Sequence, residues 1–84
     1  PGNPAIQFEL GLLKYSNKDY LGAVKAFAAA LAITPDYANA KYYLGLSLAQ
    51  LGRLDEAREQ FETLLITNPD NAELKAALKD LNKK

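Results

Sequence analysis

The sequence contains neither cysteine nor histidine. Their absence excludes disulfide bonds, thiol nucleophiles, zinc sites of the usual ligand types and the most common general base. Basic and acidic residues number ten each, so no net charge attracts the chain to nucleic acid or anionic lipid. We therefore expect no metal, no cofactor and no nucleic-acid partner.

A long apolar run is also missing. The most apolar stretch, residues 20–33, contains Lys25 and falls short of the roughly 18 to 20 apolar residues that span a membrane. The N-terminus does not resemble a signal peptide, which favours the cytoplasm, although a fragment carries little information about the compartment of its parent protein. We expect one small domain, residues 1–84, without a membrane span.

What the sequence does contain is a repeat of 34 residues. The residues that recur 34 positions later are Leu10, Gly11, Leu12, Ala23, Phe27, Leu31, Pro35 and Asp36, which return as Leu44, Gly45, Leu46, Ala57, Phe61, Leu65, Pro69 and Asp70. A third unit begins at residue 72 and stops after one helix. The chain is therefore expected to consist of two full units and part of a third.

Apolar residues at helical spacing, together with helix-ending signals, predict five helices, at about residues 4–16, 20–33, 37–51, 54–67 and 71–82. Asn3 is expected to cap the first helix and Asp36 the third. Gly52 is expected to end the third helix, because glycine readily adopts the left-handed conformation found after a helix C-terminus. Asp70, with Glu73 three residues later, resembles a capping box for the last helix.

Two antiparallel helices that cross closely need small residues at the crossing. The residues expected there are Gly11 and Gly45 on the first helix of each unit and Ala23 and Ala57 on the second. Phe27 and Phe61 are expected to form aromatic wedges between the helix layers. Each unit leaves an apolar face exposed until a neighbouring unit covers it.

The Leu-Gly pair, the later alanine, the aromatic residue four positions on and the closing proline, all at 34-residue spacing, resemble the tetratricopeptide repeat. The resemblance covers two repeats, 4–37 and 38–71, followed by a capping helix, 72–82. It implies an all-α fold, in which antiparallel helix hairpins build a right-handed superhelical solenoid of five helices. It also implies an inner groove that binds a peptide or a protein segment.

A subset of this family grips a C-terminal carboxylate with lysine, asparagine and arginine side chains. In this sequence the corresponding positions hold Phe8, Leu12, Tyr43, Glu73 and Ala77. The basic clamp is absent, so the carboxylate tail of a chaperone is not an expected ligand.

By family position, the predicted groove is lined by Phe8, Leu12, Tyr15, Asn39, Tyr42, Tyr43, Leu46 and Gln50. The same mapping adds Ala5, Glu9, Ser16, Ala49, Glu73, Ala76 and Asp80 to that side. Such an aromatic and aliphatic strip suits an amphipathic helix or an extended apolar segment of a partner protein. The aromatic residues also fit a structural role, because a small solenoid places aromatic side chains between its helices. Among them, Tyr42 is the strongest candidate for a ligand contact.

Catalysis is not expected, because a mechanism without histidine or cysteine would need carboxylates that converge in a pocket. The acids Asp55, Glu56 and Glu59 instead fall on the outer face of one helix. We therefore predict a protein-protein interaction module. The alternative is a structural or self-associating segment of a longer array, which forms a homo-oligomer through the outward edge of the first helix. Pro1, which lies 34 residues before Pro35, favours this alternative.

Overall fold

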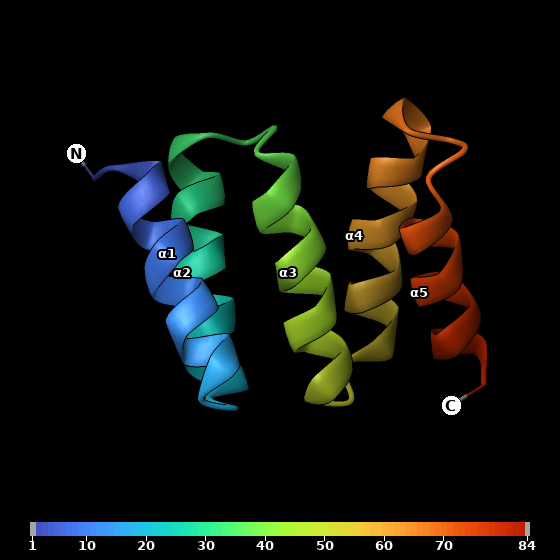
Figure 1. The fold of residues 1–84 in the computed structure, drawn as a ribbon, viewed down its shortest axis with the longest axis horizontal. Coiled ribbons are helices and arrows are strands. Elements are labelled where there is room, and N and C mark those ends of the chain that lie inside the picture. The colour runs from blue at the N-terminus through green and yellow to red at the C-terminus, as the bar shows by residue number, and fades with distance from the viewer. Residues whose placement is uncertain (1, 84) are drawn as a thin grey trace.

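The computed structural model describes residues 2–83. Its five α-helices are α1 (Pro4–Ser16), α2 (Tyr20–Ile33), α3 (Ala38–Gln50), α4 (Leu54–Thr67) and α5 (Ala72–Asn82) (Figure 1). All five agree with the predicted bounds to within one residue at each end, and the all-α class is confirmed. None of the helices within residues 2–83 is long and apolar enough to cross a membrane. Pro1, which was noted for its register with Pro35, lies outside the described residues.

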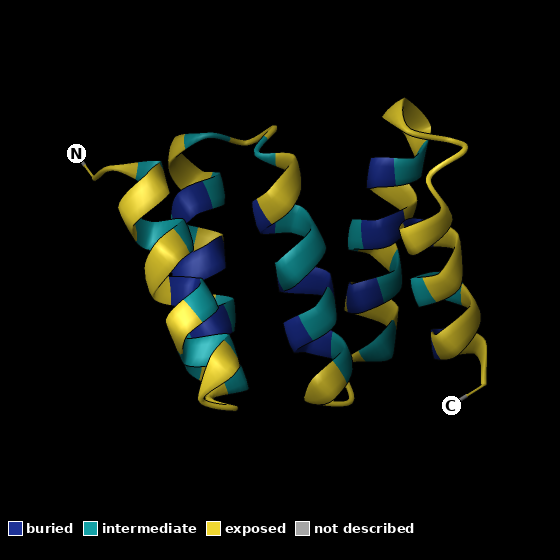
Figure 2. Ribbon diagram, viewed as in Figure 1, coloured by how far each residue is buried: buried dark blue, intermediate teal, exposed yellow. Residues whose placement is uncertain are grey.

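Each helix packs on the next one along the chain, from α1 against α2 to α4 against α5. In Figure 1 the helices form one elongated stack, with the two chain ends at opposite ends of its long axis. The extents of the molecule are 36 × 26 × 17 Å. Buried residues concentrate on α2, α3 and α4, whereas α1 buries only Gly11 (Figure 2). The stack therefore has a well-covered middle and a more exposed N-terminal helix.

Two predicted helix-end signals are confirmed. The Oδ1 atom of Asn3 accepts a hydrogen bond of 2.9 Å from the backbone N–H of Ala5, so Asn3 caps α1. Gly52 has φ +80°, the left-handed conformation that a glycine adopts at no steric cost. An unpredicted cap begins α2, where Asp19 Oδ1 accepts a bond of 2.9 Å from the N–H of Gly22.

Two predicted caps were wrong. Asp36 does not cap α3, because the helix begins one residue later and its N-cap, Tyr37, makes no side-chain capping bond. Asp70 does not cap α5 either. Asn71 does, with its Oδ1 accepting a hydrogen bond of 3.0 Å from the N–H of Leu74. Glu73 then lies two residues after the cap rather than three, which removes the capping box.

Close crossing of the hairpin helices is confirmed at both glycines. Gly11 of α1 lies against the ring of Phe27 in α2, and Gly45 of α3 lies against the ring of Phe61 in α4. Phe27 and Phe61 are fully buried, as expected for wedges between layers. The small residue therefore accommodates an aromatic ring of the partner helix, which brings the two helix axes together.

Three stripes of residues occupy equivalent positions in the repeat. They are Ile6, Leu10 and Leu13 in α1; Ala40, Leu44 and Ser47 in α3; and Leu74, Leu78 and Leu81 in α5. The stripe of α3 is buried, and that of α5 is buried at its two ends, as predicted for this helix. In α1, however, Ile6 is 61% exposed and Leu13 is 58% exposed. No helix among residues 2–83 covers the α1 stripe in the way that α2 packs on α3.

Candidate functional site

Helix α1 contacts α3, and α3 and α5 border the same two pockets; we call the side formed by these three helices the inner face. Phe8 and Tyr15 of α1 contact Tyr43 of α3, with ring centroids 5.9 Å and 5.8 Å apart. Farther along, two pockets lie between α3 and α5. Aromatic contacts thus connect α1 with α3 on the inner face, and the two pockets connect α3 with α5.

The seam between α1 and α3 is filled with aromatic side chains. Tyr43 stacks on the buried ring of Phe27 with centroids 5.9 Å apart, and Phe8 lies 5.7 Å from the same ring. Tyr37, which was not predicted to take part, lies 5.2 Å from Phe8. Leu12 follows Phe8 by one turn and also packs against the core. Phe8, Leu12, Tyr15 and Tyr43 therefore contribute to packing, whatever else they contact.

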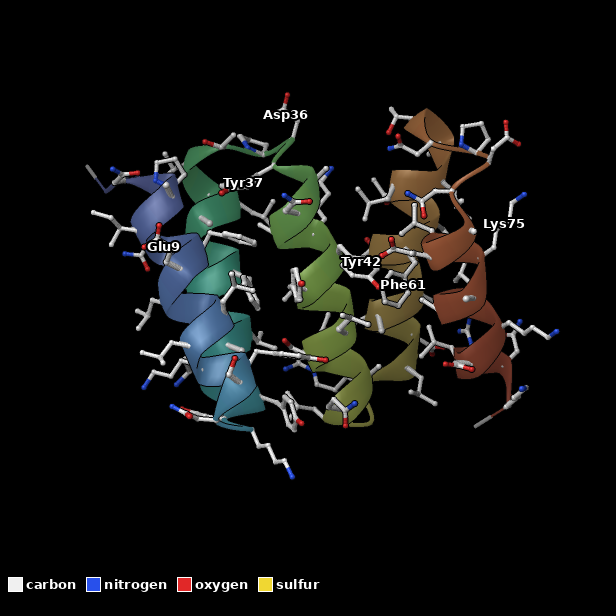
Figure 3. All side chains as sticks on the ribbon, viewed as in Figure 1. Glu9, Asp36, Tyr37, Tyr42, Phe61 and Lys75 are labelled. Atoms are coloured by element: carbon white, nitrogen blue, oxygen red, sulfur yellow. The ribbon has the colours of Figure 1, made fainter. Side chains whose placement is uncertain are left out.

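Tyr42 occupies a different position, at the edge of a pocket. Its ring centroid lies 6.0 Å from that of Phe61 and 5.4 Å from that of Tyr43. Figure 3 shows Tyr42 on α3 beside Phe61 of α4. Burial raises the pKa of the Tyr42 phenol, and the nearby carboxylate of Glu73 raises it further. Tyr42 therefore keeps its proton at neutral pH and presents a hydroxyl group and one side of an aromatic ring.

The first pocket, which we call the asparagine pocket, has a volume of about 300 Å³. It is lined by Ala38, Asn39, Tyr42, Leu64, Asn68, Asn71, Glu73 and Leu74. The second, the aliphatic pocket, has a volume of about 100 Å³ and is lined by Leu46, Ala49, Gln50, Phe61, Ala77, Asp80 and Leu81. Asn39, Tyr42, Leu46 and Gln50 were predicted groove residues, and each lines one of these two pockets.

Hydrogen bonds fix the orientation of two asparagines in the pocket. Asn68 Nδ2 donates to the carbonyl of Leu64 at 3.3 Å and to Thr67 Oγ1 at 3.1 Å, which leaves its side-chain oxygen free to accept. Asn71 uses its oxygen to cap α5. Neither asparagine was predicted to belong to the site, because both lie in the turn between α4 and α5. The sequence does place both residues next to the Pro69-Asp70 pair that ends the second repeat, and therefore close to the start of the last helix.

A larger pocket of about 500 Å³ lies elsewhere, between α4 and α5. It is lined by Glu59, Glu62, Thr63, Leu65, Ile66 and Leu78. At 100° per residue, Glu62 and Ile66 lie on the side of α4 opposite Leu64 and Asn68, so this outer pocket is separate from the inner face. It lacks the aromatic strip that adjoins the two inner pockets, and the inner face remains the candidate site.

Comparison with known proteins was made at the level of sequence and of structure. The family model described as tetratricopeptide repeat matches residues 14–81. A peroxisomal targeting signal receptor of Eremothecium gossypii is 36% identical over 67 residues, which are 80% of this chain and 12% of the receptor. The receptor of Debaryomyces hansenii is 44% identical over 55 residues, which are 66% of this chain and 9% of the receptor. The chain thus spans about a tenth of the length of these relatives.

Two solved structures have the same arrangement of helices. The first tetratricopeptide domain of Spaghetti (RPAP3), bound to the HSP90 peptide SRMEEVD, is 23% identical and superposes with a TM-score of 0.91 over 96% of this chain and 64% of that chain. The second such domain of human RPAP3, in complex with the HSP70 peptide SGPTIEEVD, is 27% identical, with a TM-score of 0.90 over 98% and 68%. The match to the family model, together with the two stacked helix hairpins, shows that the chain belongs to the tetratricopeptide repeat family.

Proposed function

We propose that this domain binds a segment of a partner protein along its inner face. One observation carries the proposal: Tyr42 and Leu46, one turn apart on α3, open into two separate pockets. Neighbouring side chains on a helix face are about 5 to 6 Å apart, and alternate side chains of a strand are about 6.6 Å apart. Side chains four positions apart in a bound helix, or two positions apart in an extended segment, therefore match the spacing of Tyr42 and Leu46.

The structural neighbours support a peptide ligand, but the residues of this chain do not favour an acidic one. Both RPAP3 domains carry peptides that end in the acidic sequence EEVD. The positions where the family clamps such a tail with basic side chains hold Phe8, Leu12, Tyr43, Glu73 and Ala77 in this chain. An acidic tail would find no positive charge at these positions, so the ligand proposed here differs from those peptides.

The proposed role is binding without catalysis. The carboxylates on the inner face, Glu9, Glu73 and Asp80, are distributed over two helices rather than gathered in one pocket. Glu73 and Asp80 are seven residues apart on α5, which separates them by about 10 Å along the helix axis. They line different pockets, and acid-base catalysis needs groups that converge on one reacting bond.

The test starts from dodecapeptides selected on the intact domain from a random library displayed on phage. Tyr42→Ala and Leu46→Ala are expected to weaken binding of the selected peptides by about 1 to 3 kcal/mol each, as loss of a buried anchor does. Ile66→Ala, in the outer pocket, is the matched control and should leave binding unchanged. Thermal unfolding should show a much smaller loss for Tyr42→Ala than for Phe61→Ala. Equal stability losses in those two variants, or peptides insensitive to Tyr42 and Leu46, would contradict the proposal.

A second candidate function rests on the exposed stripe of α1. Ile6, Leu10 and Leu13 occupy the positions that are covered by a preceding helix in α3 and α5. A helix from a second copy of the chain is one way to cover them, which would make the domain a self-associating segment. Sedimentation equilibrium tests this alternative: a concentration-dependent dimer that Leu10→Lys abolishes would support it, and a monomer at millimolar concentration would oppose it.

A further inference from the structure

The two pockets of the inner face share an electrostatic feature. Within residues 2–83, Glu73 is the only charged residue that lines the asparagine pocket, and Asp80 is the only one that lines the aliphatic pocket. Among residues 2–83, no lysine or arginine lines either pocket, although the whole chain contains as many basic as acidic residues. The charges are therefore unevenly distributed, and both pockets carry a negative charge.

Three groups that line the asparagine pocket suit a cation. The side-chain oxygen of Asn68 is free to accept because both of its donor bonds go to α4. The Glu73 carboxylate accepts hydrogen bonds only, and the ring of Tyr42 offers the negative face that attracts cations. Ammonium and guanidinium groups are donors without acceptors, so their needs match these groups. A carboxylate placed here would instead be repelled by Glu73.

Helix ends around the pocket add opposing fields. The pocket lies at the N-terminus of α5, which by itself favours an anion. Glu73 lies in that first turn, however, and the N–H of Leu74 is already bonded to Asn71. The C-terminus of α4, represented by Leu64 and Asn68, is the negative end of its helix and favours a cation. The first turn of α3, which contributes Ala38 and Asn39 to the pocket, is a second N-terminus and also favours an anion. Two positive helix ends therefore face one negative end, so the attraction of the pocket for a cation depends on the charge of Glu73.

The apolar part of the pocket fits the stem of a long basic side chain. Leu64 and Leu74 are 6% and 3% exposed and contribute apolar surface to the pocket, with Ala38 also among its lining residues. Lysine and arginine bury their methylene groups on such a surface while the charged end reaches polar partners. The neighbouring aliphatic pocket, lined by Leu46 and Phe61, suits an apolar side chain.

We propose that the segment bound on the inner face places a lysine or arginine in the asparagine pocket and an apolar side chain in the aliphatic pocket. The two side chains are four positions apart in a bound helix, or two positions apart in an extended segment, which follows from the spacing of Tyr42 and Leu46. This inference rests on the proposed function, because it names the kind of residue that the same face selects.

The experiment uses the library-selected dodecapeptides whose binding is lost in Tyr42→Ala. Lysine and arginine are expected to be enriched among them, at one position four or two residues from an apolar one. Replacing that basic residue by glutamine should weaken binding to the unaltered domain about two- to fivefold, which is typical of an exposed charge pair. Replacing the basic residue of the peptide by glutamine should hardly change its affinity for the Glu73→Gln variant of the domain. Glu62→Gln, on the outer side of α4, is the matched control and should behave like the unaltered domain.

A gain of affinity provides a second test that does not depend on weakening the domain. Asn39→Asp adds a negative charge to the pocket in the first turn of α3, where an acidic residue also favours the helix. It should strengthen binding of the basic peptides about two- to fivefold and weaken binding of their glutamate-substituted versions. Thermal melting of each variant confirms that the fold is retained.

The outcomes separate the two proposals. Peptides that depend on Tyr42 but lack a basic residue, or that bind Glu73→Gln unchanged, would overturn the lysine or arginine assignment and leave the proposed function standing. Enrichment of acidic residues would overturn the assignment in favour of an anionic ligand. If no selected peptide depends on Tyr42 or Leu46, the proposed function fails and the assignment fails with it.

Discussion

Lys18 and Gly52 occupy the same position in two turns that lie 34 residues apart, and both have a left-handed backbone, with φ of 62° and 80°. Lys18 lies between α1 and α2, and Gly52 lies between α3 and α4. This conformation is less favourable by about 1 to 2 kcal/mol for a residue with a Cβ, whereas glycine adopts it without that cost. The first turn therefore holds a strained residue where the second holds a relaxed one.

Lys18→Gly is expected to raise the free energy of unfolding by about 0.5 kcal/mol, since relief of strain exceeds the extra freedom gained by the unfolded chain. Gly52→Ala should lower it by about 1 to 2 kcal/mol. A Cβ on Gly52 would have no atom within 4 Å, so the loss would come from the left-handed backbone and not from a steric clash with other residues. Urea denaturation measures both changes. Stabilisation by Gly52→Ala would show that the left-handed backbone is not required in that turn.

The crossing glycines give the second prediction. A Cβ on Gly11 would lie 2.4 Å from the ring of Phe27, and one on Gly45 would lie 2.6 Å from the ring of Phe61. In an exposed helix, replacing glycine by alanine would increase the stability by up to about 1 kcal/mol. Here we expect a loss of about 1 to 3 kcal/mol, because the added methyl group overpacks the crossing. Thermal unfolding of the two variants measures the loss.

A matched background shows whether the ring is the cause. In Phe27→Leu, the side chain facing Gly11 is smaller, so Gly11→Ala should be less costly there than in the unaltered chain. A rise in melting temperature for Gly45→Ala would contradict the assigned crossing.

The helix caps give the third prediction, which tests the corrected cap positions. Asn71→Ala is expected to lower the free energy of unfolding by about 1 kcal/mol, because the N–H of Leu74 loses its capping partner. Asp36→Ala and Asp70→Ala should change it by less than about 0.5 kcal/mol, as exposed substitutions usually do. Urea denaturation of the three variants measures the difference. A larger loss of unfolding free energy in Asp70→Ala than in Asn71→Ala would show that Asp70 caps α5, as the sequence predicted.

The exposed stripe of α1 gives the fourth prediction. Amide hydrogen exchange should be faster at residues 10–13 of α1 than at the equivalent residues 44–47 of α3, because terminal elements open at low free-energy cost. Appending a helix before Pro4 that covers Ile6, Leu10 and Leu13 should slow exchange in α1. Equal protection of the two segments in the unextended monomer would mean that α1 needs no neighbour.

Helix bounds were predictable because the strongest stop and start signals act locally. Proline fixes its own backbone and restricts the residue before it, so the signals at Asn3-Pro4 and Thr34-Pro35 act within two residues. Gly52 acts at its own position, where it adopts a left-handed backbone. The choice between Asp70 and Asn71 as a cap was not predictable in this way. Two adjacent residues with oxygen-bearing side chains offer the same chemistry, and a shift of one residue in the turn decides between them.

The candidate site was predictable only where it follows from the helical repeat. The spacing of Tyr42 and Leu46 places them on one face of α3 before any tertiary structure is known. The contribution of Asn68 depends instead on how the turn after α4 folds back against α3. The contact between Phe8 and Tyr37 joins residues 29 positions apart and likewise depends on the stacking of one hairpin on the next.

The stacking of each helix on its chain neighbours also has a kinetic consequence. Contacts between residues close in sequence form without closing long loops, and helical proteins of this kind fold within microseconds to milliseconds. Unfolding can then begin at either end of the stack, with α5 or α1 leaving while the middle persists. A partner that spans the pockets between α3 and α5 would tie α5 to a helix that is not its neighbour in the chain. Such a ligand would slow the unfolding of α5 more than that of α1. The bound and the free domain would therefore differ in the order in which their helices unfold.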